Sequence, residues 1–101
     1  MYETPLRRAI ALAKTGTRTA IDEITATLTP DISIAESKFI DFALSHVESE
    51  EGIRVMEDYL FHCTQIQRNY AALYFGRRGE YPLLRRAYEA GAIDGIQAFS
   101  R

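Results

Sequence analysis

Residues that start and stop helices divide this chain into short pieces, and this division limits the fold more than any other feature. A serine or threonine before a helix accepts hydrogen bonds from its unpaired first N–H groups, and proline in the first turn loses no useful donor. Such starts occur at Thr4-Pro5, at Ser33 with Glu36 in capping-box spacing, at Ser49, at Thr64 and at Tyr81-Pro82. Glycines that can end a helix follow at Gly16, Gly79 and Gly91. No alternation of apolar and polar residues predicts a strand, so the chain is predicted to be all-α.

The spacing of apolar residues predicts which side of each of the first three helices faces inward. The first helix, from Pro5 to Gly16, would bury Leu6, Ala9, Ile10 and Ala13. The second would be capped by Thr19 and would bury Ile21, Ile24 and Leu28. The third would run from Ser33 to about Val47 with a wide apolar face: Ala35, Phe39, Phe42, Ala43 and Val47, flanked by Ile40 and Leu44.

The stretch from Ser49 to Gly79 is predicted to form two helices joined near Cys63-Thr64. Their inward residues would be Ile53, Met56, Leu60 and Cys63 in the first, and Ile66, Tyr70, Leu73 and Tyr74 in the second. Phe61 and Phe75 fall outside these faces, so they are either exposed contact residues or covered by a further layer of helices. A helix from Tyr81-Pro82 to Gly91 would then bury Leu83, Leu84, Ala87 and Tyr88, and a short one would follow from Ile93 to Phe99.

Length and composition favour a single folded domain over residues 1–101. Hydrophobic residues make up 47% and charged residues 26% of the chain, which is the balance of a folded protein and not of a disordered one. The single cysteine, Cys63, excludes an intramolecular disulfide and an all-cysteine zinc site. No apolar run approaches the ~20 residues that span a bilayer, and the first residues make a poor signal peptide. We therefore expect a cytoplasmic protein that does not bind membranes.

No group of residues predicts catalysis, a metal site or a cofactor. Asp58 and His62 lie one helical turn apart beside Cys63, but no His-x-x-x-His or Cys-x-x-Cys spacing supplies further metal ligands. We expect this pair to be a solvated contact on the helix surface. No Ser/His/Asp arrangement and no glycine loop after a strand is present either. The prediction is a protein that is not an enzyme, with no catalytic or metal-binding residue and no cofactor.

Two pairs of arginines are the strongest indication of a binding surface. Arg77-Arg78 and Arg85-Arg86 bracket a turn that contains Tyr81, and residues 66–101 hold six arginines against three acidic side chains. We expect these arginines, with Tyr81, Phe61 and Phe75, to bind an acidic surface of a protein partner, either another protein or a second copy of this chain. The alternative is a nucleic-acid-binding module that uses the same arginines. Such modules usually carry a clear basic excess, whereas this chain has a net charge of −2.

The segment GIRVMEDYLFHCTQIQRNYAALYFGRRGEYPLLRRAYEAG, residues 52–91, resembles a helical repeat unit of the HEAT type. In that pattern a helix leads into a second helix rich in small residues, and a glycine-bounded turn leads to the next. The resemblance implies a binding scaffold. For the whole chain we expect five to six short helices in antiparallel pairs, as a HEAT-like array or a small orthogonal bundle. A faint internal repeat accompanies it, since Leu6-Arg7-Arg8-Ala9 recurs 78 positions later as Leu84-Arg85-Arg86-Ala87. This distance is close to twice the ~40-residue period of helical repeats.

Overall fold

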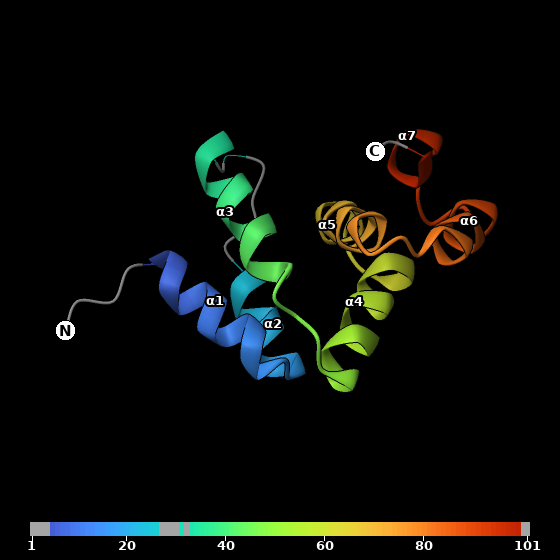
Figure 1. The fold of residues 1–101 in the computed structure, drawn as a ribbon. Helices are drawn as coiled ribbons and strands as arrows, with labels where there is room; N and C mark the ends of the chain where they lie inside the picture. Colours follow the sequence, from blue (N-terminus) through green and yellow to red (C-terminus); the bar gives the residue numbers. More distant parts are fainter. Residues whose placement is uncertain (1–4, 27–30, 32, 100–101) are drawn as a thin grey trace. The chain divides into compact units, whose positions relative to one another are not determined.

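The structure, a computed structural model, describes residues 5–26, 31 and 33–99. These residues form helices and contain no strand, so the prediction of an all-α fold is confirmed (Figure 1). None of the described helices is long and apolar enough to cross a membrane. The chain divides into two compact units, Met1–Val55 and Met56–Arg101. The assignment of residues 1–101 to one domain and the HEAT-like pairing of the helices stay predictions.

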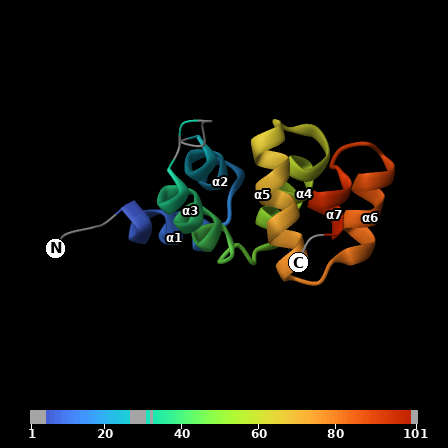
Figure 2. The ribbon, with the colours of Figure 1, turned by 90° about the horizontal axis from the view of Figure 1, so that it is seen from above.

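The first unit contains α1 (Pro5–Thr15), α2 (Arg18–Thr25), α3 (Ile34–Leu44) and residues 50–55 of α4 (Glu50–His62). Helix α1 packs against both α2 and α3, as Figures 1 and 2 show. The predicted inward residues of α1 and α2 are confirmed for the four that are buried: Ala9, Ala13, Ile21 and Ile24. Leu6 and Ile10 are half-buried, and Thr4 and Leu28 lie outside the described residues.

A sharp corner joins α1 to α2. The N–H of Gly16 donates to the carbonyl of Leu12 at 3.1 Å, and Gly16 has a φ of +69°, in the left-handed region that favours glycine. Thr17 then caps α2, because its hydroxyl accepts a hydrogen bond from the N–H of Ala20 at 3.2 Å. The prediction of Thr19 as the cap is wrong, since the left-handed glycine turns the chain early enough for the helix to begin directly after Thr17.

Helix α3 begins as predicted but differs in its end and in its inward face. The hydroxyl of Ser33 accepts the N–H of Glu36 at 3.1 Å, so the predicted start is confirmed. The helix ends at Leu44, before the predicted end near Val47, and its buried residues are Ile40, Ala43 and Leu44. Phe42 is 53% exposed and Ala35 is exposed, although both were predicted to face inward. The inward face is shifted toward Ile40 and Leu44, which were predicted to be its flank, and both α1 and α2 pack against α3.

The start of α4 lies close to the corner between α1 and α2. The hydroxyl of Ser49 donates to the carbonyl of Gly16 at 2.8 Å and accepts the N–H of Gly52 at 2.9 Å. The carboxylate of Glu51 accepts the N–H of Arg18, at the start of α2, at 2.9 Å. The prediction that Ser49 caps this helix is confirmed. Both side chains also join segments that are far apart in the sequence.

We expect Ser49→Ala to lower the free energy of unfolding by about 2 kcal/mol, the upper end of the range for a lost cap. Alanine removes the hydrogen bond to the carbonyl of Gly16 as well as the cap on Gly52. Urea unfolding followed by circular dichroism measures the change. Ser33→Ala is the matched control, because Ser33 caps α3 from an exposed position, and it should cost about 1 kcal/mol. Equal losses in the two variants would contradict a stabilising role for the contact with Gly16.

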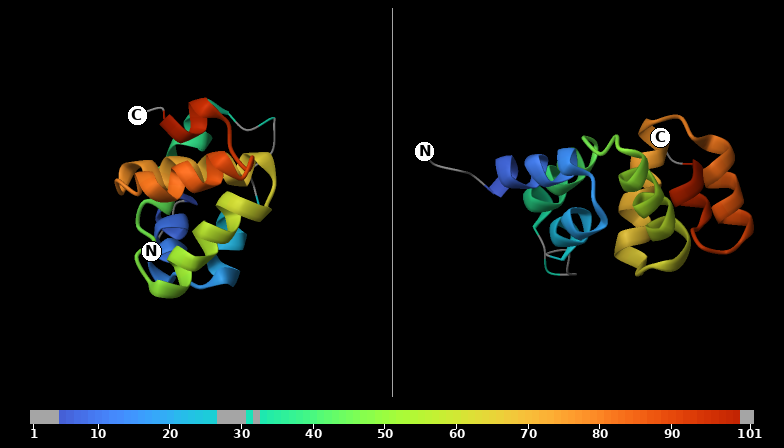
Figure 3. Two further views of the ribbon diagram at one scale, coloured as in Figure 1. Left: turned by 90° about the vertical axis from the view of Figure 1, so that its right-hand side faces the viewer. Right: turned by 90° about the horizontal axis from the view of Figure 1, so that it is seen from below.

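The second unit contains the rest of α4, α5 (Gln65–Arg77), α6 (Tyr81–Glu89) and α7 (Gly95–Phe99). Helices α5, α6 and α7 pack against one another (Figure 3). The large side chains that are buried come from α4, α5 and α6: Met56, Tyr59, Leu60, Tyr70, Tyr74, Phe75, Leu83 and Leu84. Aromatic side chains therefore provide much of the buried volume in this unit.

Local signals set the ends of α5 and α6 as predicted. Thr64 and Gln67 form a capping box, in which the N–H of Gln67 donates to Thr64 Oγ1 at 3.2 Å and the N–H of Thr64 donates to Gln67 Oε1 at 3.1 Å. Gly79 follows α5 with a φ of +74°, and Gly91 follows α6 with a φ of +77°. The predicted starts and stops of both helices are confirmed.

The inward face of α5 is rotated from its predicted position. Tyr70 and Tyr74 are buried as predicted, but Leu73 is 45% exposed. The buried face instead extends over the small residues Ala71 and Ala72 and over Phe75.

Two predictions near helix ends are wrong. Cys63 is half-buried and not inside, because α4 ends at His62 and the chain leaves the helical phase there. Helix α7 begins at Gly95 and not at Ile93. The N–H of Ala98 donates to the carbonyl of Asp94 at 3.0 Å, which places Asp94 at the cap position.

Candidate functional site

The predicted partner-binding arginines lie on the surface of the second unit, at the end of α5 and along α6. Together with the exposed tyrosine between them they form what we call the arginine–tyrosine surface: Arg77, Arg78, Tyr81, Arg85 and Arg86. The guanidinium carbon of Arg78 lies 5.3 Å from the centre of the Tyr74 ring. This cation–π contact holds Arg78 against the end of α5.

Helix α6 divides the arginine–tyrosine surface into two sides. Adjacent residues of a helix point about 100° apart, so Arg85 and Arg86 do not share a side. Tyr81, Arg85 and Tyr88 do share one, and we call these three residues the α6 stripe. Tyr81 is 43% and Tyr88 44% exposed. The prediction that Tyr88 faces inward is wrong, because Leu83, Leu84 and Ala87 form the buried side.

Phe61 and Phe75 have different environments. Phe75 is only 2% exposed, and its ring contacts the Tyr74 ring edge to face with the ring centres 5.0 Å apart. Phe61 is half-buried on α4. The prediction that Phe75 belongs to a partner-binding surface is therefore wrong, since its side chain is part of the core. Phe61 keeps part of its surface accessible to a partner.

A groove in the first unit is a second candidate site, which the sequence did not predict. Its volume is about 290 Å³, near the lower limit of ~300 Å³ for ligand pockets. Residues of α1, α2 and α3 line it: Pro5, Arg8, Ala9, Leu12, Glu23, Ile24, Glu36, Phe39 and Ile40. We call it the α1–α3 groove. Because its walls come from three helices, no local spacing in the sequence reveals it.

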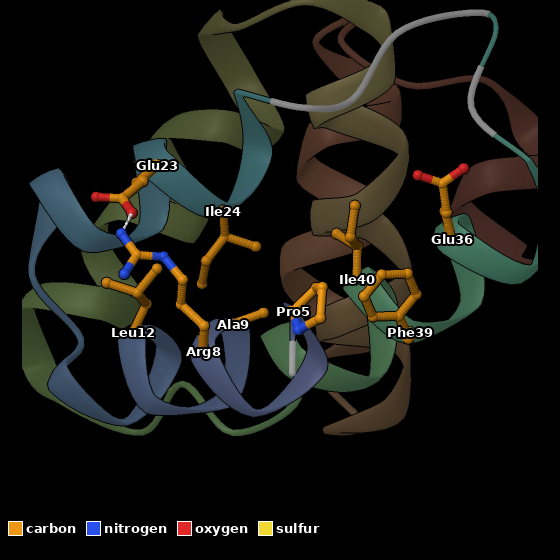
Figure 4. Close-up of a pocket in the computed structure, with 9 residues that line it drawn as sticks. All are labelled: Pro5, Arg8, Ala9, Leu12, Glu23, Ile24, Glu36, Phe39 and Ile40. Atoms are coloured by element: carbon orange, nitrogen blue, oxygen red, sulfur yellow. Dashed lines mark hydrogen bonds and ion pairs between the residues drawn. The ribbon is translucent and has the colours of Figure 1, made fainter. Parts of the chain in front are cut away.

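The charged residues of the α1–α3 groove lie on either side of an apolar centre. Figure 4 shows Arg8 and Glu23 joined by an ion pair on one side and Glu36 on the other, with the apolar side chains between them. The Arg8 and Glu23 side chains are 60% and 46% exposed, so their ion pair contributes only about 0–1 kcal/mol and can rearrange around an occupant. The charged residues that line the groove are one cation, Arg8, and two carboxylates, Glu23 and Glu36. The groove therefore favours an occupant with an apolar middle part and a positive charge at its edge.

The Asp58–His62 pair forms on the outer side of α4. His62 Nδ1 lies 3.2 Å from Asp58 Oδ1, and the two side chains are 74% and 38% exposed, respectively. Within the part of the chain that the structure describes, no three His, Cys, Asp or Glu side chains come together to hold a metal ion. The geometry of this pair is that of a contact between side chains one helical turn apart.

The repeated Leu-Arg-Arg-Ala motif occupies similar positions in α1 and α6. Ala9 and Ala87 are both buried, and a glycine with positive φ ends each helix. Each glycine is followed by an Ile-Asp-x-Ile segment, Ile21 to Ile24 and Ile93 to Ile96. The first isoleucine of each segment is buried, but of the second isoleucines only Ile24 is buried, since Ile96 is 78% exposed. The structural similarity therefore covers the helix and its stop and only part of the next segment.

Comparisons with models of protein families, with curated proteins and with solved structures found no match to this chain. The resemblance of residues 52–91 to HEAT-type repeats stays a prediction. The function must therefore be argued from the two surfaces of the chain itself, the arginine–tyrosine surface and the α1–α3 groove.

Proposed function

We propose that this chain is a small protein-interaction or accessory module of the cytoplasm without catalytic activity of its own. It binds an acidic surface of a protein partner through the α6 stripe and the neighbouring arginines. The observation that supports this proposal is the exposure of Tyr81 and Tyr88 on the same side of α6 as Arg85. Tyrosine and arginine are enriched at the centres of protein interfaces, because they bury a large area and still offer a polar group.

Exposed apolar side chains extend this surface beyond α6. A Cβ atom built on Gly95 would lie 3.9 Å from Tyr88 Cε1, so the start of α7 lies beside the Tyr88 end of the α6 stripe. The next residue, Ile96, is 78% exposed. On α5, Leu73 is 45% exposed and lies one helical turn before Arg77. An apolar area beside cations is suited to a partner that combines apolar and acidic residues.

Removing the four cations tests the proposal. We expect the variant Arg77→Gln/Arg78→Gln/Arg85→Gln/Arg86→Gln to lose at least about tenfold of the partner captured from lysate, because interfacial charge pairs and arginine contacts are lost together. Quantitative mass spectrometry of the captured proteins measures the loss. The matched control is Arg7→Gln/Lys14→Gln/Lys38→Gln/Arg54→Gln, which removes four exposed cations of the first unit and changes the net charge equally. Equal capture by the two variants would rule out the arginine–tyrosine surface.

The same variant separates a protein partner from a nucleic acid. Contacts to phosphates release counterions, so nucleic-acid binding weakens steeply with salt. We expect no mobility shift of labelled DNA or RNA oligonucleotides at about 50 mM salt. A shift that disappears at about 200 mM salt and is absent in the four-arginine variant would favour the nucleic-acid-binding alternative.

A further inference from the structure

We propose that a second copy of this chain is a partner, with the α6 stripe of one copy docked in the α1–α3 groove of the next. The inference rests on the proposed function, because it identifies the acidic partner surface as the α1–α3 groove of a second copy. The contact joins two different surfaces and is therefore head to tail. Repetition of such a contact gives a ring or an open chain of copies.

The side-chain chemistry of the α6 stripe matches that of the α1–α3 groove. The α1–α3 groove presents an apolar centre, including Ile24 and Phe39, with Glu36 at its edge. The α6 stripe presents two aromatic rings with Arg85 between them. When the tyrosine rings cover the apolar centre, Arg85 can pair with the carboxylate of Glu36, and arginine and carboxylate form the stronger, bidentate kind of ion pair.

The α6 stripe and the α1 side of the groove also match in length. On α1 the lining runs from Pro5 to Leu12, and the α6 stripe runs from Tyr81 to Tyr88. Both pairs are separated by seven positions of helix, or about 10 Å at a rise of ~1.5 Å per residue. Grooves that bind a helix usually take anchors at positions i, i+4 and i+7, which is the spacing of the α6 stripe.

The two units of the chain carry net charges of opposite sign. Residues 1–55 hold six basic and nine acidic side chains, which leaves −3, and residues 56–101 hold six basic and five acidic side chains, which leaves +1. The unit that carries the α1–α3 groove therefore attracts the unit of a second copy that carries the α6 stripe. Two copies of the same unit do not attract one another in this way.

The size of the groove limits the strength of this contact. A cavity of about 290 Å³ holds only a few side chains, and a stable interface usually buries at least ~1,200 Å². We expect weak association, with a Kd of about 10 µM to 1 mM. The full chain should therefore be monomeric when dilute and should self-associate when concentrated.

Two complementary variants test the head-to-tail contact by sedimentation velocity. The groove variant, Glu36→Arg/Phe39→Ala, keeps the α6 stripe, and the stripe variant, Tyr81→Ala/Arg85→Glu, keeps the groove. We expect wild-type chains to associate as their concentration rises toward about 1 mM, and each variant alone to stay monomeric. An equimolar mixture of the two variants should form a 1:1 dimer and nothing larger, because one intact groove and one intact stripe remain.

Each other result overturns the inference. Wild-type chains that stay monomeric would overturn it, while loss of capture by the four-arginine variant would leave the proposed function standing with another partner. A mixture that stays monomeric while wild type associates would show that the contact uses other surfaces, provided that thermal unfolding shows both variants to be folded. If the stripe variant associates as strongly as wild type and the four-arginine variant captures normally, the proposed function fails as well.

Discussion

Gly16→Ala is expected to lower the free energy of unfolding by about 2–5 kcal/mol, through two separate costs. The φ of Gly16 is +69°, and an L-residue with a side chain pays about 1–2 kcal/mol in this region. The new Cβ would also overlap Ser49 Oγ and lie 2.9 Å from Ser49 Cβ. Ser49 would have to move away from the carbonyl of Gly16 and the N–H of Gly52, and overpacking of this kind costs about 1–3 kcal/mol.

Gly79→Ala separates these two costs. Gly79 has nearly the same φ, +74°, but a Cβ built on it meets nothing within 4 Å. Gly79→Ala should therefore lower the free energy of unfolding only by the cost of the left-handed backbone conformation, about 1–2 kcal/mol. The reduced freedom of the unfolded chain is common to both substitutions and cancels in the comparison. Scanning calorimetry of both variants measures the difference, and similar losses would mean that Ser49 moves at no cost.

Phe75→Ala is expected to cost about 3–5 kcal/mol, the range for a buried phenylalanine reduced to alanine. Phe75 is 2% exposed, and its ring rests against the Tyr74 ring. The substitution would leave a cavity and remove this aromatic contact. Unfolding in urea, followed by circular dichroism, measures the loss.

Phe61→Ala is the matched control for this substitution, because it removes the same atoms from a half-buried position on α4. We expect a smaller loss, about 1–2 kcal/mol, since part of the ring already contacts water. If Phe61→Ala lowered the free energy of unfolding more than Phe75→Ala, Phe75 would again be a candidate partner-contact residue. Such a result would also contradict the assignment of Phe75 to the core.

The ends of the helices were predictable because the groups that set them are close in sequence. Ser33 reaches an N–H only three residues ahead, and Thr64 and Gln67 exchange hydrogen bonds over the same distance. The left-handed glycines are likewise a property of one residue. The prediction failed at Thr19 because the cap position depends on where the preceding turn ends, and the left-handed turn at Gly16 places Thr17 at the start of α2.

The inward faces of the helices were less predictable, because neighbouring helices decide them. The apolar patterns of α3 and α5 are broad enough to allow more than one rotation of the helix. Packing selected the rotations that expose Phe42 and Leu73 and bury Phe75. A local pattern shows that a face exists, but the area that another helix covers determines where it lies.

Of the two candidate surfaces, the arginine–tyrosine surface was predictable from the sequence and the α1–α3 groove was not. The arginines at the end of α5 and in α6 were visible as a cluster, because neighbours in a short helix–turn–helix segment stay neighbours in space. Helical geometry then separated Arg85 from Arg86 and placed Tyr88 beside Arg85. The α1–α3 groove and the contact of Ser49 with Gly16 arose only in the folded chain. Each joins segments that are far apart in the sequence, and no residue pattern predicts that they meet. Only tertiary packing brings such segments together.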